Sequence, residues 1–148
     1  MSPFKLFTHY RRFGIKLEEI AEQVKEIQPE LIGISINFTP YWETAIEVAQ
    51  ICKLLLPQVP IVAGGHHATA APERLLDSKA IDFVILGEGE ERMVEFVKLL
   101  STQNLGQLND LDGIAFVSCG QIKINQQKYA IENLDNLSQP NQDRKSVV

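Results

Sequence analysis

Residues 31–65 decide the fold, because they read as a strand, a helix and a second strand in succession: LIGISINFTPYWETAIEVAQICKLLLPQVPIVAGG. The two apolar runs, 31–36 and 61–63, are short and rich in branched side chains, and each ends in small or polar residues. Buried parallel strands have this composition, and their carboxyl ends open onto the ligand crevice of an α/β sheet. We therefore expect a parallel strand–helix–strand unit with a binding edge where the strands end.

Strands and helices continue to alternate on both sides of this unit. Upstream, apolar residues recur at helical spacing from Leu17 until Pro29 ends the helix. Downstream, a short helix begins at Pro72, a third strand occupies residues 82–86, and another helix follows the stretch Gly87–Glu90. Such alternation is typical of parallel crossovers, so the sequence predicts a doubly wound α/β domain with a parallel sheet.

The pattern changes in the last third of the chain. Two β-rich runs, 113–118 and 121–125, flank a Cys-Gly pair and predict a β-hairpin. Residues 133–148 are polar and without periodicity, so we expect a linker or a tail there. The expected organisation is one α/β domain over residues 1–132, hairpin included, followed by this tail.

Two finer expectations concern the first strand and the helix after it. The run Leu31–Ile36 is apolar at both odd and even positions except for Gly33, which predicts a strand covered on both faces. Thr39 precedes Pro40, a residue favoured in the first helical turn, so we expect Thr39 to be the N-cap.

Composition excludes several classes of partner. With 148 residues and 45% hydrophobic content, the chain is long enough for one domain with a proper core. A net charge of -5 and a pI near 5.2 argue against a nucleic-acid partner. No apolar run is long enough for a signal peptide or a membrane span, and the two cysteines lie far apart. We therefore expect a protein of the reducing cytoplasm, with no membrane partner.

The residues after each strand are the candidate binding residues. Hydroxyl and amide groups follow the first strand, a glycine pair and a histidine the second, and a Gly-Glu pair the third: Ser35, Asn37, Thr39, Gly64, Gly65, His66, Gly87 and Glu88. Glycines allow a flat or extended ligand to approach the backbone closely.

Structural roles are the alternatives for these same residues. The hydroxyls are equally suited to capping, the glycine pair to a tight turn, and the acidic residues after the third strand to complementing a helix dipole. Adjacent His66 and His67 point in different directions, so we expect no metal site. Cys52 lies on the apolar stripe of a helix and Cys119 in a hairpin turn, and neither is a candidate nucleophile. We expect no catalytic residue in this chain.

Three stretches together carry a resemblance to a known family. They are residues 31–40, residues 60–69 (PIVAGGHHAT) and residues 82–90 (DFVILGEGE). In this order and at crossover spacing, they resemble the cobalamin-binding domain that precedes the radical S-adenosylmethionine domain in one enzyme superfamily. The resemblance covers about residues 15–137 and implies a flavodoxin-like, Rossmann-like fold.

The resemblance also implies a ligand and its position. In related domains the residues in the positions of Ser35 and Thr39 lie beside the nucleotide tail of cobalamin (vitamin B12). Asn37 occupies a place that is often apolar in those domains. The glycine pair with His66, and the loop that contains Gly87 and Glu88, would complete the binding edge.

Two departures from the family pattern are visible. The Asp-x-His-x-x-Gly motif, whose histidine ligates cobalt in one class of cobalamin domain, is absent, as is the Cys-x3-Cys-x2-Cys triad of a [4Fe-4S] cluster. We therefore expect no cobalt ligand and no iron–sulfur cluster from this chain. The family's first strand and helix have no counterpart, which predicts a truncated domain with an unpaired strand edge.

These observations favour a cobalamin-binding module that positions a corrinoid for a radical S-adenosylmethionine domain or protein. Two alternatives stay open. One is an inert remnant or protein-interaction module that keeps the fold without binding cobalamin. The other is an α/β enzyme for phosphorylated or nucleotide substrates, although the chain has no phosphate-loop motif and no catalytic triad.

Overall fold

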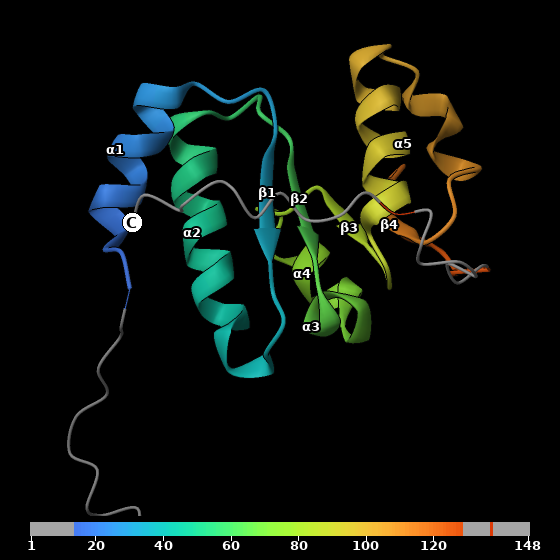
Figure 1. The fold of residues 1–148 in the computed structure, drawn as a ribbon, viewed down its shortest axis with the longest axis horizontal. Helices are drawn as coiled ribbons and strands as arrows, with labels where there is room; N and C mark the ends of the chain where they lie inside the picture. Colours follow the sequence, from blue (N-terminus) through green and yellow to red (C-terminus); the bar gives the residue numbers. More distant parts are fainter. Residues whose placement is uncertain (1–13, 129–136, 138–148) are drawn as a thin grey trace, which may run out of the picture.

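The computed structural model describes residues 14–128 and residue 137 and contains a five-stranded sheet in the order β1-β2-β3-β4-β5 (Figure 1). Its first three strands run parallel and its last two continue antiparallel: β1 (Ile32–Ser35), β2 (Ile61–Gly64), β3 (Phe83–Ile85), β4 (Ile114–Ser118) and β5 (Gln121–Asn125). The predicted α/β fold with a C-terminal hairpin is confirmed, and the hairpin extends the same sheet.

Helices connect and cover these strands. They are α1 (Leu17–Ile27), the 3-10 helix η2 (Thr39–Tyr41), α2 (Trp42–Leu55), α3 (His66–Ala70), α4 (Pro72–Asp77), α5 (Glu90–Ser101) and the 3-10 helix η3 (Leu105–Asn109). The short helix α3 was not expected, because the sequence there reads as a turn after the glycine pair. The turn is real, but it leads at once into a helix that begins at His66.

Apolar side chains form two clusters on opposite faces of the sheet, because successive residues of a strand point to opposite sides. Ala63 of β2 belongs to one cluster, which α2, α3 and α4 cover, while its neighbour Val62 belongs to the other, which α5 and η3 cover. In β3 the same alternation separates Val84 from Ile85. Helices therefore lie on both faces of the sheet, as the doubly wound arrangement requires.

The expectation that the first strand is covered on both faces is wrong for the described residues. Ile32 and Ile34 are partly buried against the cluster under α2, but Gly33 and Ser35 are exposed. The cluster on that second face, under α5 and η3, takes most of its strand residues from β3 and β4. Helix α5 therefore covers the far half of the sheet, and no described helix covers the second face of β1. In the described part of the chain, β1 pairs with β2 alone.

The expected helix cap is also corrected. Phe38, not Thr39, is the N-cap of η2, and it makes no capping hydrogen bond through its side chain. Thr39 is the first residue of η2, and its Oγ1 lies 3.2 Å from Nδ1 of His67. The hydroxyl therefore ties η2 to α3 instead of capping the helix.

At the amino ends of the strands, Asp82 holds two elements together. Its Oδ2 accepts a hydrogen bond of 2.7 Å from the backbone N–H of Ile61 and lies 2.7 Å from Nζ of Lys53. The same lysine donates to the carbonyl of Val59 at 2.9 Å. One carboxylate thus fixes the start of β2 against both α2 and the β3 strand.

Replacing Asp82 tests this anchor. In Asp82→Ala the N–H of the fully buried Ile61 loses its acceptor, so we expect the free energy of unfolding to fall by about 1–3 kcal/mol. Asp82→Asn keeps an acceptor oxygen and should lose less. Urea denaturation measures both variants, and equal losses would show that the charge of Asp82, and not its acceptor oxygen, supports the strand.

The tail predicted for residues 133–148 falls outside the described residues, apart from Leu137. Among the described helices, none has the length and apolar content needed to cross a membrane.

Candidate functional site

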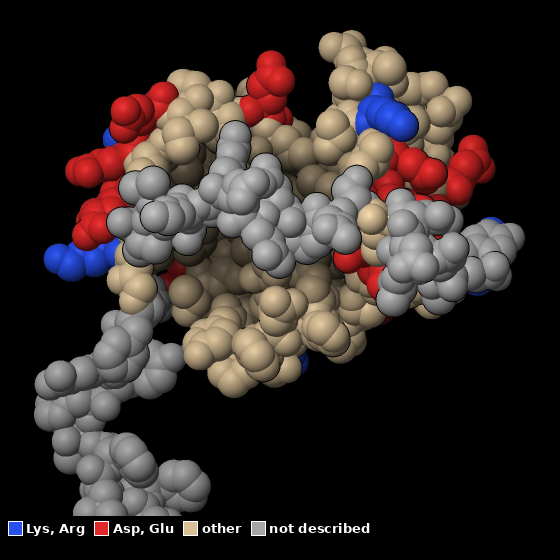
Figure 2. All heavy atoms as spheres, in the orientation of Figure 1, with Lys and Arg blue, Asp and Glu red and all other residues tan. Residues whose placement is uncertain are grey.

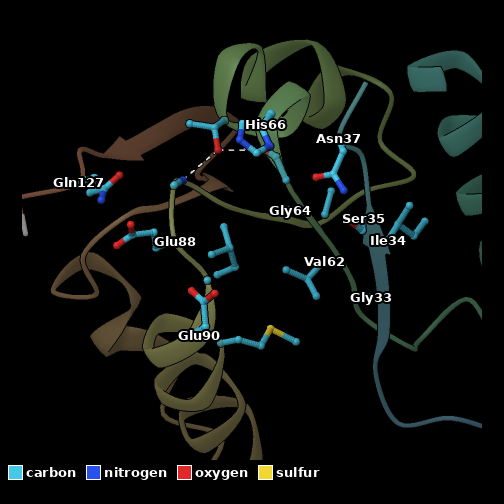
Figure 3. A pocket seen from close by; sticks show the side chains of 17 residues that line it. Gly33, Ile34, Ser35, Asn37, Val62, Gly64, His66, Glu88, Glu90 and Gln127 are labelled. Carbon is cyan, nitrogen blue, oxygen red and sulfur yellow. Dashed lines mark hydrogen bonds between the residues drawn. The ribbon is translucent and has the colours of Figure 1, made fainter. Parts of the chain in front are cut away.

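A pocket of about 850 Å³ opens on the face of the sheet that carries α5, between β1 and the start of that helix (Figure 3). Its floor comes from β1 and β2. Its rims come from the loops that follow β1, β2 and β3, from the helices α3 and α5, and from Gln127 after β5. The lining residues of the floor are Gly33, Ser35, Val62 and Gly64, and those of the rims include Asn37, Gly65, His66, Thr69, Gly87, Glu88, Gly89, Glu90, Met93 and Gln127. The pocket therefore extends from the strand ends onto the sheet itself.

The floor is flat because two of its four residues are glycines. Ser35 is the register partner of Gly64, and Gly33 that of Val62, so the four lie side by side on adjacent strands. A Cβ at Gly33 would meet nothing within 4 Å, and one at Gly64 would lie 4.0 Å from the carbonyl oxygen of Ile85. Neither glycine is therefore needed for backbone packing. Glycine in a strand interior commonly marks the close approach of a ligand.

Gly65, at the end of β2, is a glycine for a different reason. Its φ of 100° is unfavourable for residues with a side chain. A Cβ there would lie 2.7 Å from Oδ1 of Asn37 and 2.9 Å from the carbonyl oxygen of Ile36. That carbonyl accepts a 2.9 Å hydrogen bond from the N–H of His67. Gly65 thus lets the loop after β1 and the start of α3 pack directly together.

Arg92 holds in place the rim that contains Glu88. This residue is buried, and its guanidinium donates to the backbone carbonyl of Glu88 and, at 2.8 Å, to Oδ2 of Asp112. A Cβ at Gly113 would lie 2.5 Å from Nε of Arg92, so the absence of a side chain at Gly113 makes room for it. Arg92 therefore holds the loop of Glu88 against the connection that enters β4.

Thr69 joins the two rims that follow β2 and β3. Its hydroxyl accepts a hydrogen bond of 2.8 Å from the N–H of Gly87 and donates one of 3.0 Å to the carbonyl of Gly65 (dashed in Figure 3). The helix α3, which the sequence did not predict, brings this side chain to the pocket.

The electrostatic character of the pocket is mildly acidic. Glu88 and Glu90 lie on the rim near α5, and no lysine or arginine is among the described residues that line the pocket. Figure 2 shows acidic side chains gathered over α1, whereas the surface at the bottom of this view, over the strand ends, is mostly uncharged. The described lining therefore offers neutral hydrogen-bonding groups beside an apolar surface.

The structure brings together all but one of the predicted binding residues. Ser35, Asn37, Gly64, Gly65, His66, Gly87 and Glu88 line the same pocket, whereas the hydroxyl of Thr39 turns to His67 behind the rim. Trp42, the first residue of α2, packs on the core with the guanidinium of Arg74 4.9 Å from its ring centroid.

Both cysteines lie outside the described lining of the pocket. Burial raises the pKa of the Cys52 thiol, which disfavours the thiolate needed for nucleophilic attack. Within the part of the chain that the structure describes, no three His, Cys, Asp or Glu side chains are grouped to hold a metal ion.

Sequence reasoning missed Gly33, Val62, Thr69, Met93 and Gln127 as lining residues. A signal for the first of them is present in the sequence. Gly33 and Ser35 are the small residues on one face of a strand whose other face carries Ile32 and Ile34. That period-2 alternation indicates a strand with one open face, whereas the apolar run as a whole predicts a strand covered on both faces.

Comparison with known proteins decides the family. The family model for the B12 binding domain matches residues 8–97, which include β1, β2, β3 and the glycine-rich loops of the pocket. The chain belongs to the B12-binding domain family. The resemblance inferred from the three sequence stretches is thereby confirmed.

Curated relatives of this B12-binding domain include methyltransferases. The chain is 29% identical over 130 residues to an uncharacterized methyltransferase of Pyrococcus horikoshii, PH0819, covering 87% of the chain and 28% of the relative. It is also 29% identical over 109 residues to the cytidylyl-2-hydroxyethylphosphonate methyltransferase of Streptomyces wedmorensis, covering 72% of the chain and 20% of the relative. The chain thus spans less than a third of the length of either relative.

Solved structures share the fold. The cobalamin-dependent S-adenosylmethionine radical enzyme OxsB, with aqua-cobalamin bound, superimposes with a TM-score of 0.66 at 22% identity, covering 79% of the chain and 16% of OxsB. The radical S-adenosylmethionine methyltransferase TsrM of Kitasatospora setae, with cobalamin and a [4Fe-4S] cluster bound, gives a TM-score of 0.64 at 17% identity, covering 82% of the chain and 23% of TsrM. At these identities the likeness concerns the fold.

Proposed function

We propose that this chain binds cobalamin, with the nucleotide tail of the cofactor in the pocket between β1 and α5. The observation that carries the proposal is the bare floor. Gly33 and Gly64 stand on adjacent parallel strands, neither is required by the local backbone, and together they let a flat group lie on the sheet. Membership of the B12-binding domain family supports cobalamin as that ligand.

The residues present fit this group. A volume of about 850 Å³ lies within the range of about 300–1,000 Å³ that is usual for cofactor pockets. Val62, Ile85 and Met93 would contact the aromatic base of the tail, and Ser35 and Asn37 would supply hydrogen bonds to its polar atoms. Glu88 and Glu90 would accept hydrogen bonds from the neutral amide groups that surround a corrin ring.

Bound cobalamin would supply a cobalt centre able to carry a methyl group or to serve radical chemistry, and this chemistry belongs to the cofactor. The chain's own residues would hold the cofactor in position. The floor would fix the tail, and the rims of Gly65 and Gly87 would hold the ring at the strand ends, where the surface is mostly uncharged. The chain would then act as a holder of the cofactor and not as its reactive partner.

A neighbouring radical S-adenosylmethionine domain would complete the catalytic unit. This part of the proposal is supported by the relatives, of which the chain spans less than a third. It is also supported by the fold that the chain shares with OxsB and TsrM, since both are named as S-adenosylmethionine radical proteins.

Retention of cobalamin by the purified chain tests the proposal. We expect the protein, after mixing with hydroxocobalamin and gel filtration, to elute with the visible absorbance of a corrinoid at a ratio near one per chain. The matched control is the same mixture with urea-unfolded protein. If the folded chain elutes without corrinoid, the proposal fails, and an inert or protein-interacting member of the family is the better description.

A further inference from the structure

Strands β2 and β3 stop pairing at the pocket. Their ladder ends with the pair Ala63 and Val84. Beyond that pair the chain enters two separate loops, one through Gly65 with a φ of 100° and one through Gly87 with a φ of 67°. These two loops form adjacent rims of the pocket, and the Thr69 hydroxyl connects them.

The direction of both hydrogen bonds of Thr69 is fixed by chemistry. A backbone N–H can only donate and a carbonyl can only accept, so the hydroxyl receives the bond from Gly87 and gives its own hydrogen to Gly65. The backbone N–H of Thr69 also donates to the carbonyl of Gly65, at 3.0 Å. Two hydrogen bonds therefore fix Thr69 to the rim of Gly65, and its hydroxyl links that rim to the rim of Gly87.

We propose that Thr69 is a positioning residue for cobalamin, whose hydroxyl sets the width of the pocket mouth by holding the loops of Gly65 and Gly87 at a fixed separation. The inference rests on the proposed function and adds a determinant of affinity to it. The same bond keeps the Gly87 N–H engaged by the protein. Arg92 also holds the loop of Glu88, but it does so against Asp112, whereas Thr69 links this loop to the rim of Gly65.

This role predicts a loss of binding that exceeds the loss of stability. Gly87 and Thr69 are both exposed, so the freed N–H of Gly87 can turn to water when the hydroxyl is removed. The folded state therefore loses little. A ligand that needs both rims in place must instead order the Gly87 loop on binding, and that ordering lowers its affinity.

Three variants test the inference in the full chain. We expect Thr69→Val, which removes the hydroxyl and keeps the shape, to weaken hydroxocobalamin binding about tenfold, and Thr69→Ser to restore affinity to within about twofold of the wild type. Thr102→Val is the matched control, because the Thr102 hydroxyl also bonds backbone carbonyls but lies at the end of α5. Its affinity should be unchanged, and its melting temperature should resemble that of Thr69→Val.

A readout that needs no ligand separates this inference from the proposed function. Hydrogen exchange of the Gly87 amide in the free protein should be slow in the wild type and in Thr69→Ser, and faster in Thr69→Val. Unchanged exchange in Thr69→Val would overturn the coupling of the rims, as would wild-type affinity in that variant or an equal loss in Thr69→Ser. Failure of the wild-type chain to bind cobalamin would overturn the proposed function instead.

Discussion

Gly65→Val unfolds at a much lower urea concentration than the wild type, because a β-branched residue cannot adopt the conformation that Gly65 holds. With a φ of 100°, the new Cβ would lie 2.7 Å from Oδ1 of Asn37 and 2.9 Å from the carbonyl oxygen of Ile36. Relief of that contact would break the hydrogen bond from the N–H of His67 to the same carbonyl. We expect the free energy of unfolding to fall by about 3 kcal/mol or more.

His66→Ala is the control for this result. His66 is exposed and follows Gly65 directly, so its replacement changes the same rim without straining the backbone. We expect its stability to stay within about 0.5 kcal/mol of the wild type. Equal midpoints of unfolding for Gly65→Val and His66→Ala would contradict the account of this turn.

Gly64→Val should differ from Gly65→Val, because we expect it to weaken cobalamin binding without loss of stability. Its effect on binding is the largest that we expect. The new side chain would stand on the floor of the pocket and occupy the space of the ligand, so cobalamin affinity should fall at least about 100-fold, which corresponds to about 2.7 kcal/mol. Stability should stay equal or rise by up to about 1 kcal/mol, because glycine is unfavourable in a strand. Titration followed by visible absorbance, together with urea denaturation, measures both quantities.

Two further glycines sharpen this test. Gly33→Val places the same side chain on the floor from β1, where a Cβ meets nothing within 4 Å, and should also abolish binding. Gly106 has equally open surroundings but lies in η3, away from the pocket, so Gly106→Val should leave affinity unchanged. Full cobalamin binding by both floor variants would show that the ligand does not lie on the sheet.

The contrast between Gly64 and Gly65 shows what the sequence can and cannot supply. The pair reads as a strand-end turn, and the sequence placed both glycines at the binding edge. Only the structure separates their roles, because the need for glycine at position 65 comes from Asn37 and Ile36, which are distant in the sequence. The periodicity of a sequence shows which residues of one helix or strand share a face. It does not show which residues of another strand or loop contact them.

The parallel strands and the hairpin were predictable because each is coded locally, by branched apolar runs that end in turn residues. The open face of β1 was not predictable, since the coverage of this strand depends on how far α5 extends over the sheet. Thr69 and Arg92 were missed for a related reason. Each acts through a backbone group of another loop, at Gly87 and at Glu88, and no spacing in the sequence encodes those contacts.

The central claim, that the pocket holds the nucleotide tail of cobalamin, is tested most directly by a comparison of cobalamin with cobinamide, which has the corrin ring but lacks the tail. Titration calorimetry on the full chain would measure both affinities. The account predicts that cobalamin binds and that cobinamide binds at least about 100-fold more weakly, because only the tail reaches the floor of Gly33 and Gly64. Equal affinity for the two corrinoids would contradict it.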